Sequence, residues 1–363
     1  MKKLLLSTAL TGVLITTSAI AQTSVTGNMT IGLRSTSEKG AAGAVTTASK
    51  RGMLAETQLN VQNKGKLNNG MDYAAGFALE FDANETTSLN TSQSNAHGRS
   101  IANENTFIDL ISGGTTVSFS IDHMNDFDRS MASRVGEHGA STGAAGGMTA
   151  STMVMADPLN TTSAYGINVR QAFPNIGQIT LAYVPTATCS STNAQGCGGA
   201  DTTVVEGDEG SAYSALLELP NIGIKGLNFE AGMVEQAKKV GSTTSPNRDA
   251  KFTTIGANYT TGPVSLGYNK KEHTNGSSTT AFEKKDQDDF GITYTAGNLS
   301  YGVLYQKVDS NITTKADEKY KAIAVGYNLG PVAAMLNVGK HDNVSGTAGT
   351  DADSITLKLR TSF

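Results

Sequence analysis

The last residues of the chain, 355–363, are ITLKLRTSF, and apolar and polar side chains alternate along them. A strand directs successive side chains to opposite faces. One face of this segment would therefore be apolar, with Ile355, Leu357, Leu359 and Phe363, while the other would carry two positive charges. A chain that ends on such a strand, with no tail, needs a different environment on each face.

The same alternation recurs along the chain, and it predicts strands with one buried face. We count sixteen such segments, with an error of about two, and find no convincing amphipathic helix between them. The segments that begin near 105 and 251 are the least regular. The expected starts are near residues 24, 53, 73, 105, 115, 163, 177, 212, 227, 251, 263, 288, 299, 319, 331 and 354.

The connections between these segments are sorted by length. Short ones, such as 112–114, 174–177 and 296–298, alternate with long ones, such as 83–104 and 185–210. Transmembrane antiparallel β-barrels have short turns at one end and long loops at the other, and an even strand number brings both chain ends to the short-turn end. About sixteen strands enclose more space than side chains fill, so the polar face would line water and the apolar face would meet lipid.

Tyr and Phe residues lie near the ends of the predicted strands. Amphipathic rings favour the headgroup level of a membrane, so we interpret them as girdles, whereas ordinary core aromatics would lie in mid-strand. They are Tyr183, Phe229, Tyr259, Tyr268, Tyr301, Tyr305, Tyr327 and Phe363.

The chain begins with Lys2 and Lys3, an apolar stretch, and small residues that end in Ala19-Ile20-Ala21. This pattern is typical of a secretory signal peptide that is cleaved after Ala21. A single spanning anchor is the alternative, but the apolar stretch is shorter than the ~20 residues that a spanning helix needs. Residues 1–21 would be the leader, and residues 22–363 would form one barrel domain.

The charge balance and the motifs exclude several classes of function. Removal of the leader leaves 26 of the 28 basic residues against 32 acidic ones, so the exported chain has a net charge of −6. A nucleic-acid partner is disfavoured, because such partners select a basic face. P-loop, nucleophile-elbow and zinc-protease motifs are missing, and the five histidines are scattered. We predict no enzymatic activity and no cofactor.

Two polar stretches could have a local structural role. Cys189 and Cys197 are close together in one of them, which in an exported protein predicts a disulfide; free thiols, or half of a metal site, are the alternatives. The next stretch holds acids that could bind calcium in an outer loop, although such acids are usually just solvated. These acids are Asp201, Glu206, Asp208 and Glu209.

The leader, the alternating segments, the sorted connections and the terminal aromatic strand together resemble the Gram-negative general porins, of the type common in alphaproteobacteria. The resemblance covers residues 22–363 and rests on architecture, since porins lack a sharp internal motif. It implies an outer-membrane channel for passive diffusion of ions and small hydrophilic solutes. It also implies a homotrimer in contact with outer-membrane lipid and lipopolysaccharide, with both termini periplasmic. In that family the barrel-assembly machinery reads a terminal Phe, here Phe363.

The resemblance further implies that the loop after the fifth strand folds into the lumen, where its acids face basic residues on the wall. The matching segment is 123–162, the longest connection of the chain, and a loop of this length needs a function. A solvated external flap is the alternative. The candidate acids are Asp122, Asp126, Asp128 and Glu137, and the candidate wall anchors are Met148, Met153 and Met155.

Alternation predicts which charged side chains line the lumen. Arg34, Lys358 and Arg360 would form a basic wall, and Arg170 would point inward beside a short turn. Charges act more strongly in a confined passage than on an open surface, although each could be an ordinary wall residue. With few inward arginines and a negative net charge, we predict a mild cation preference. The acidic wall residues would be Glu56, Glu80, Asp82, Glu218 and Glu230.

Two other interpretations stay open. A substrate-specific channel would keep the barrel but show a saturable conductance that its solute blocks. A secreted adhesin or surface-layer protein, built as a β-sandwich or β-helix, would be soluble and would have no lumen.

Overall fold

The computed structural model describes residues 21–40, 45–84, 100–121, 165–184, 211–236, 250–274 and 284–363. These residues form sixteen β-strands and one short 3-10 helix, η2 (Val344–Gly346). No helix among them is long and apolar enough to cross a membrane. The strands are β1 (Gln22–Lys39), β2 (Val45–Lys66), β3 (Asp72–Asn84), β4 (Ser100–Ser112), β5 (Thr115–Ile121), β6 (Tyr165–Phe173), β7 (Gly177–Val184), β8 (Ala212–Leu219), β9 (Leu227–Gln236), β10 (Ala250–Thr261), β11 (Val264–Thr274), β12 (Lys284–Ala296), β13 (Leu299–Ser310), β14 (Glu318–Asn328), β15 (Val332–Asp342) and β16 (Asp351–Ser362).

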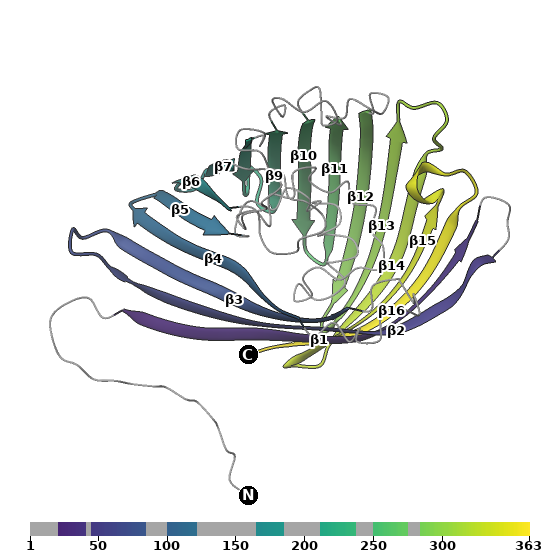
Figure 1. Cartoon of the computed structure of the whole chain (residues 1–363), viewed down its shortest axis with the longest axis horizontal. Coiled ribbons are helices and arrows are strands. Elements are labelled where there is room, and N and C mark those ends of the chain that lie inside the picture. The colour runs from purple at the N-terminus through teal and green to yellow at the C-terminus, as the bar shows by residue number, and fades with distance from the viewer. Residues whose placement is uncertain are drawn as a thin grey trace, which may run out of the picture.

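The sheet closes on itself. Each strand pairs antiparallel with its sequence neighbours, and β1 also pairs with β16, so that the first strand (purple) lies beside the last (yellow) in Figure 1. The Gly27 N–H donates to the Phe363 carbonyl oxygen over 2.8 Å, and the Phe363 N–H donates to the Gly27 carbonyl oxygen over 2.9 Å. Closure satisfies backbone groups that lipid cannot satisfy. The predicted barrel, its strand number and its closing pair are confirmed.

The connections differ in length between the two ends of the barrel. At one end they are short, namely 67–71, 113–114, 174–176, 220–226, 262–263, 297–298 and 329–331. At the other end they span 40–44, 85–99, 122–164, 185–211, 237–249, 275–283, 311–317 and 343–350. We call these the short-turn end and the long-loop end. The predicted sorting is confirmed for most connections, although 40–44 is as short as 67–71 and 311–317 is as short as 220–226. The start of β1 and the end of β16 lie at the short-turn end.

Several strands begin earlier than the sequence pattern predicts. The largest difference is in β2, which begins at Val45 and not near residue 53. Its first residues, VTTASKRG, do not alternate in polarity, because a strand that continues beyond the lipid-facing part of the wall keeps its backbone hydrogen bonds without needing one apolar face. At 18 and 22 residues, β1 and β2 are longer than the roughly 9–11 residues that a membrane-spanning strand needs.

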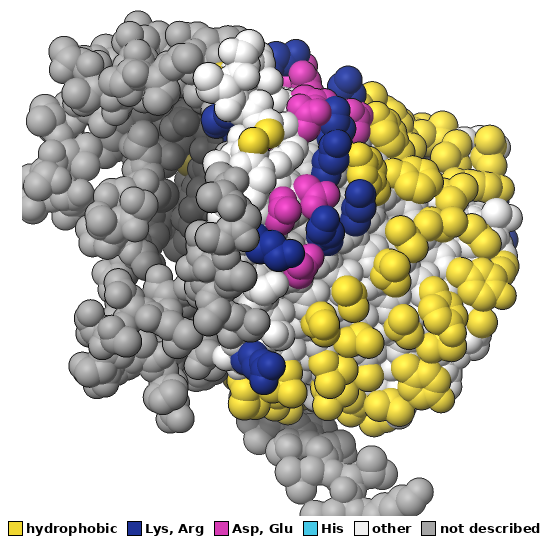
Figure 2. All heavy atoms as spheres, turned by 90° about the vertical axis from the view of Figure 1, so that its right-hand side faces the viewer, with side chains coloured by type: hydrophobic (Ala, Val, Ile, Leu, Met, Phe, Trp, Pro, Cys, Tyr) yellow, Lys and Arg dark blue, Asp and Glu magenta, His cyan; other side chains and the backbone are white. Residues whose placement is uncertain are grey.

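The two faces of the wall differ in polarity as predicted. On β16 the side chain of Leu357 is 44 % exposed on the outer face, whereas Thr356 and Lys358 on the inner face are 0 % and 3 % exposed. Outward apolar side chains recur around the barrel, and on the face shown in Figure 2 they cover a broad zone of the wall in yellow. We call this surface the apolar belt. It meets the requirement of a wall that stands in lipid.

Aromatic side chains lie on the outer face of this wall. Tyr294 of β12 is directly opposite Tyr301 of β13 near the short-turn end, and both are exposed. Near the long-loop end the rings of Tyr183 and Tyr213 are 5.2 Å apart, centroid to centroid. At the chain terminus the Phe363 ring covers Gly27, where an added Cβ atom would come within 2.6 Å of it.

The inner wall is less uniformly polar than the alternation suggests. Phe252 of β10 lies on the inner face while Ile255 lies on the outer face, and Phe107 and Ile108 divide in the same way on β4. This explains why these two segments show the weakest alternation. The register of β4 against β3 also shifts between Gly76 and Ala78. The buried apolar cluster of the inner wall consists of Val184, Ala212, Leu216, Val234, Phe252, Leu304, Val308, Tyr320 and Ala322.

Candidate functional site: the inner wall of the barrel

Three basic side chains lie on the inner face where the barrel closes. Lys358 and Arg360 belong to β16, and Arg34 belongs to β1. Arg34 is directly opposite Thr356, which shares its face of β16 with Lys358 and Arg360. We call Arg34, Lys358 and Arg360 the basic seam. The structure therefore brings together the three residues that alternation assigned to a basic wall.

The acidic side chains of the inner wall lie in two places. Glu56 of β2 shares a row with Arg360, because a single β1 residue pairs with both, and Glu80 lies on the neighbouring β3. The second place is formed by β8 and β9, where Glu218 is directly opposite Glu230. These strands are half the ring away from β16 and β1. Glu218 and Glu230 therefore lie across the barrel from the basic seam and form what we call the acidic side, whereas Glu56 and Glu80 lie beside the seam.

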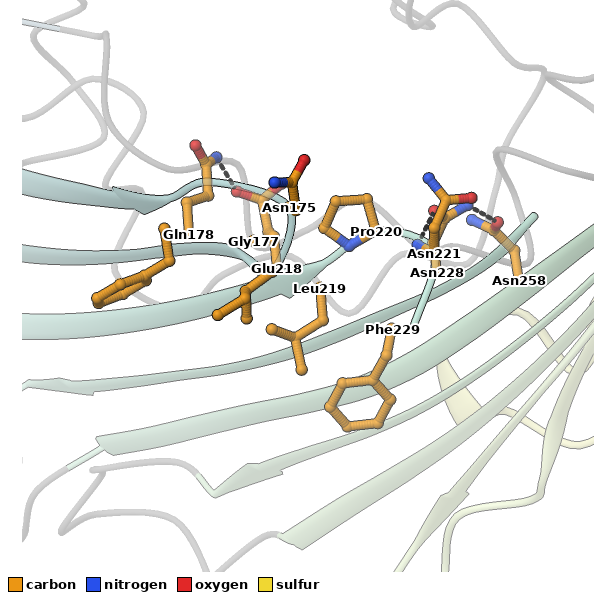
Figure 3. A pocket seen from close by; sticks show the side chains of 12 residues that line it. Asn175, Gly177, Gln178, Glu218, Leu219, Pro220, Asn221, Asn228, Phe229 and Asn258 are labelled. Atoms are coloured by element: carbon orange, nitrogen blue, oxygen red, sulfur yellow. Dashed lines mark hydrogen bonds between the residues drawn. The ribbon is translucent and has the colours of Figure 1, made fainter. Parts of the chain in front are cut away.

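The acidic side ends in a pocket of about 720 Å³ at the short-turn end of β6–β10 (Figure 3). In Figure 3 the polar ends of Gln178 and Glu218 point to one side of the wall, while Leu219 and Phe229 point to the other. The polar part of its lining consists of Asn175, Gln178, Glu218, Asn221, Asn228 and Asn258. Sequence reasoning identified Glu218 but missed the amides around it.

Hydrogen bonds connect the polar residues that line this pocket, which we call the rim. Gln178 Nε2 donates to Glu218 Oε2 between β7 and β8, and Asn228 Nδ2 donates to Asn258 Oδ1 over 2.7 Å. In the turn 220–226, Asn221 has a φ of 55°, a left-handed conformation that Asn tolerates better than most residues. The rim thus presents amide donors, carbonyl acceptors and a carboxylate, a set that suits hydroxyl-rich or cationic solutes.

A second polar network occupies the inner face of β11–β13. Asp289 is fully buried, and its Oδ1 accepts from Gln287 Nε2 over 2.6 Å and from Gln306 Nε2 over 3.0 Å. On the strand beside it, Asn269 Nδ2 donates to Thr254 Oγ1 over 3.0 Å. A buried carboxylate requires such donors, because desolvation without them is costly. Sequence reasoning missed Asp289, although its alternation with the outward Phe290 was a usable signal.

The remaining site predictions have mixed outcomes. Arg170 lies on the inner face of β6, close to the turn 174–176, and is exposed. Among the described residues, no three His, Cys, Asp or Glu side chains converge as a metal site. The predictions that lie outside the described residues are the leader up to residue 20, the acids Asp122, Asp126, Asp128 and Glu137, the methionine anchors, the Cys189–Cys197 disulfide, the calcium candidates and the side chain of Asp82.

A closed antiparallel barrel with an apolar outer belt and a charged, hydrogen-bonding inner wall defines a transmembrane β-barrel channel. The family model of the Gram-negative porins matches residues 7–359, so the chain belongs to that family. No curated protein is similar enough to match it.

Solved structures share this fold at low sequence identity. The anion-selective porin from Comamonas acidovorans is 14 % identical, with a TM-score of 0.63 over 94 % of this chain and 100 % of its own. A triple mutant of the Rhodopseudomonas blastica porin is 16 % identical, with a TM-score of 0.57 over 94 % and 100 %. Outer-membrane-expressed OmpT of Vibrio cholerae is 11 % identical, with a TM-score of 0.60 over 97 % and 100 %. At such identities the likeness shows the fold alone.

Membership of the porin family makes this protein an outer-membrane channel through which small solutes diffuse passively. The resemblance drawn from the sequence is confirmed. Porins are channels without catalytic function, which agrees with the predicted lack of enzymatic motifs.

Proposed function

We propose that this porin selects small hydrophilic solutes by size and by charge, across a field between the basic seam and acidic groups on the facing side. The observation that carries the proposal is the placement of Lys358 and Arg360 half a ring away from Glu218 and Glu230. Opposite charges across a narrow lumen orient water and act differently on cations and anions.

The segment 123–162 completes the proposed constriction by folding into the lumen, where its acids would face the basic seam. The apolar cluster of the inner wall supports this fold. Its members Phe252, Leu304 and Tyr320 are almost fully buried, and apolar side chains are unfavourable on a water-filled wall unless another part of the chain covers them.

The same proposal covers assembly. The mature chain would begin after cleavage at Ala21, assemble as a homotrimer and place both termini in the periplasm. The start of β1 and the end of β16 lie at the short-turn end of the barrel, which is the periplasmic end in outer-membrane barrels. Phe363, an exposed aromatic residue at the end of the last strand, would be the signal for the barrel-assembly machinery.

Conductance in a planar lipid bilayer tests the proposal. Purified mature protein should insert in steps of three equal conductances, and a salt gradient should give a reversal potential that favours potassium mildly over chloride, because the net charge of the mature chain is negative. A chloride preference would contradict the proposed charge selection, and an absence of steps in several detergents would contradict the channel itself.

A substrate-specific channel is the second candidate, and the rim pocket favours it. Its amides and Glu218 resemble the lining expected for a hydroxyl-rich solute. Such a channel would show conductance that falls and saturates as an oligosaccharide is added. Conductance independent of added sugar would leave passive diffusion as the function.

A further inference from the structure

Two short turns of the barrel repeat one sequence. Residues 174–177 and 220–223 are both Pro-Asn-Ile-Gly, and the asparagine of each is left-handed, with a φ of 62° at Asn175 and 55° at Asn221. The first turn joins β6 to β7, the second joins β8 to β9, and β7 pairs with β8. The repeat therefore places two asparagine side chains at fixed points of the pocket that lies at the short-turn end of these strands.

The polar lining of this pocket divides into two groups. One, which we call the carboxylate group, consists of Asn175, Gln178 and Glu218, and the other, which we call the amide group, consists of Asn221, Asn228 and Asn258. In Figure 3 the Pro220 ring lies between them. Glu218 is directly opposite Glu230, so Asn228 is its diagonal neighbour, at about 7–8 Å. A ligand that contacts both groups has to extend over roughly that distance.

The amide group presents hydrogen-bond donors to the pocket. Asn221 Oδ1 accepts from the Gly226 N–H over 2.8 Å, and Asn228 Oδ1 accepts from the Asn221 N–H over 3.2 Å. Asn258 Oδ1 accepts from Asn228 Nδ2 over 2.7 Å. Because each amide oxygen already accepts a hydrogen bond within the protein, the N–H groups, and above all Asn221 Nδ2, are the atoms that meet a ligand. Such donors favour a ligand with a carbonyl oxygen, which only accepts.

The carboxylate group has the opposite character. A carboxylate accepts hydrogen bonds and donates none, and Gln178 Nε2 donates to one oxygen of Glu218, Oε2. The other oxygen suits an N–H or O–H of a ligand, and a hydrogen bond to an ionised acceptor is stronger than one between neutral groups. The described residues that line the pocket include no Lys or Arg, so an anionic ligand is disfavoured.

We propose that this pocket binds neutral oligosaccharides of N-acetylated amino sugars. An acetamido group has an N–H donor, a carbonyl acceptor and a methyl group, which match the carboxylate group, the amide group and the Pro220 ring. Two consecutive sugars offer one acetamido group to each polar group, whereas a sugar with hydroxyls alone lacks the carbonyl oxygen and the methyl group. The inference rests on the proposed function and deepens its second candidate, the substrate-specific channel, by naming the class of substrate.

Isothermal titration calorimetry of the mature protein in detergent tests the site with two trisaccharides of the same linkage. Tri-N-acetylchitotriose should bind at least about tenfold more tightly than cellotriose, which has hydroxyls in place of the acetamido groups. The reason is that a site built to hydrogen-bond one polar group leaves its own groups unpaired around an analogue that lacks it. Equal affinities would overturn the inference, and this comparison needs no variant.

Two variants test the polar groups separately. Asn221→Gly removes the amide but keeps a residue that tolerates a positive φ, and Glu218→Ala removes the carboxylate. Each should weaken the binding of tri-N-acetylchitotriose about tenfold, because each removes one hydrogen-bonding group from the site. The matched control Asn69→Gly removes an exposed amide from the turn 67–71, outside the pocket, and should keep wild-type affinity. Wild-type affinity in both Asn221→Gly and Glu218→Ala would overturn the site.

N-acetylated sugars have two sources, namely a free oligosaccharide in transit and the cell-wall glycan. Isolated cell-wall sacculi that sediment the wild type but not Asn221→Gly would identify the wall, whereas calorimetric binding without sedimentation would identify the free oligosaccharide. Planar-bilayer conductance separates this inference from the proposed function. A wild type that conducts but binds both trisaccharides equally contradicts the sugar site alone, whereas one that binds selectively but does not conduct contradicts the channel.

Discussion

The two faces of β16 differ in which kind of side chain is exposed. On its outer face Ile355, Leu357 and Leu359 are exposed, and on its inner face Thr356 and Lys358 are buried. In a soluble domain this would be an inverted pattern. Here exposure on the outer face means contact with lipid, so the side chains that favour an apolar solvent are where that solvent is. Burial alone does not identify the side chains that stabilise such a barrel. An exposed apolar side chain stabilises the fold where the solvent is lipid and destabilises it where the solvent is water.

Replacement of Leu357 by Arg gives the largest expected change in the free energy of unfolding, because it places a charge in the middle of the apolar belt. A basic side chain near the bilayer midplane of a barrel costs about 2–4 kcal/mol. We expect that loss in the free energy of unfolding, measured by urea titration of the protein folded in lipid vesicles. Leu357→Val is the control and should cost less than half as much. A loss below 1 kcal/mol for Leu357→Arg would place this residue outside the lipid-facing belt.

Replacement of Lys358 by Glu tests the inner face one residue away. The side chain is on the lumen side, so we expect the potassium-to-chloride permeability ratio to rise about twofold or more, since charges act strongly in a confined passage. Reversal potentials across a salt gradient measure this ratio, and Lys358→Gln should give half of the effect. Folding should be retained, as shown by an unchanged heat-induced shift in gel mobility. An unchanged ratio would reduce Lys358 to a structural wall residue.

Replacement of Glu218 by Gln should give the smallest change. It should raise the free energy of unfolding, whereas Leu357→Arg should lower it. It removes one of two carboxylates that are directly opposite one another and keeps an oxygen that accepts from Gln178. Relief of a like-charge pair is worth roughly 0.2–1 kcal/mol, so the free energy of unfolding should rise by that amount. Glu80→Gln is the control, because its partners across the strands are Gln58 and Ala102. A loss of stability in Glu218→Gln would mean that the carboxylate has a stabilising partner.

The sequence predicted which charged residues lie on the inner wall, but it did not predict which side chains surround them. Arg34, Lys358 and Arg360 fall on the inner face because the period of a strand is two, and that period needs no knowledge of neighbours. The rim amides around Glu218 were missed, because they come from separate strands and turns that only strand pairing brings together. Two pairs of lysines on the outer face were missed for the same reason, since Lys307, Lys319 and Lys340 occur on three different strands.

The sequence by itself determined the strands, their two faces and the sorting of the connections, because alternation and turn residues are local properties of the chain. It also predicted the closing pair of β1 and β16, since an even number of strands with sorted connections leaves no other partner for the ends. Only the tertiary structure decided the register. Register depends on hydrogen bonds between different strands, and it alone places Glu218 opposite Glu230 and Lys307 opposite Lys319.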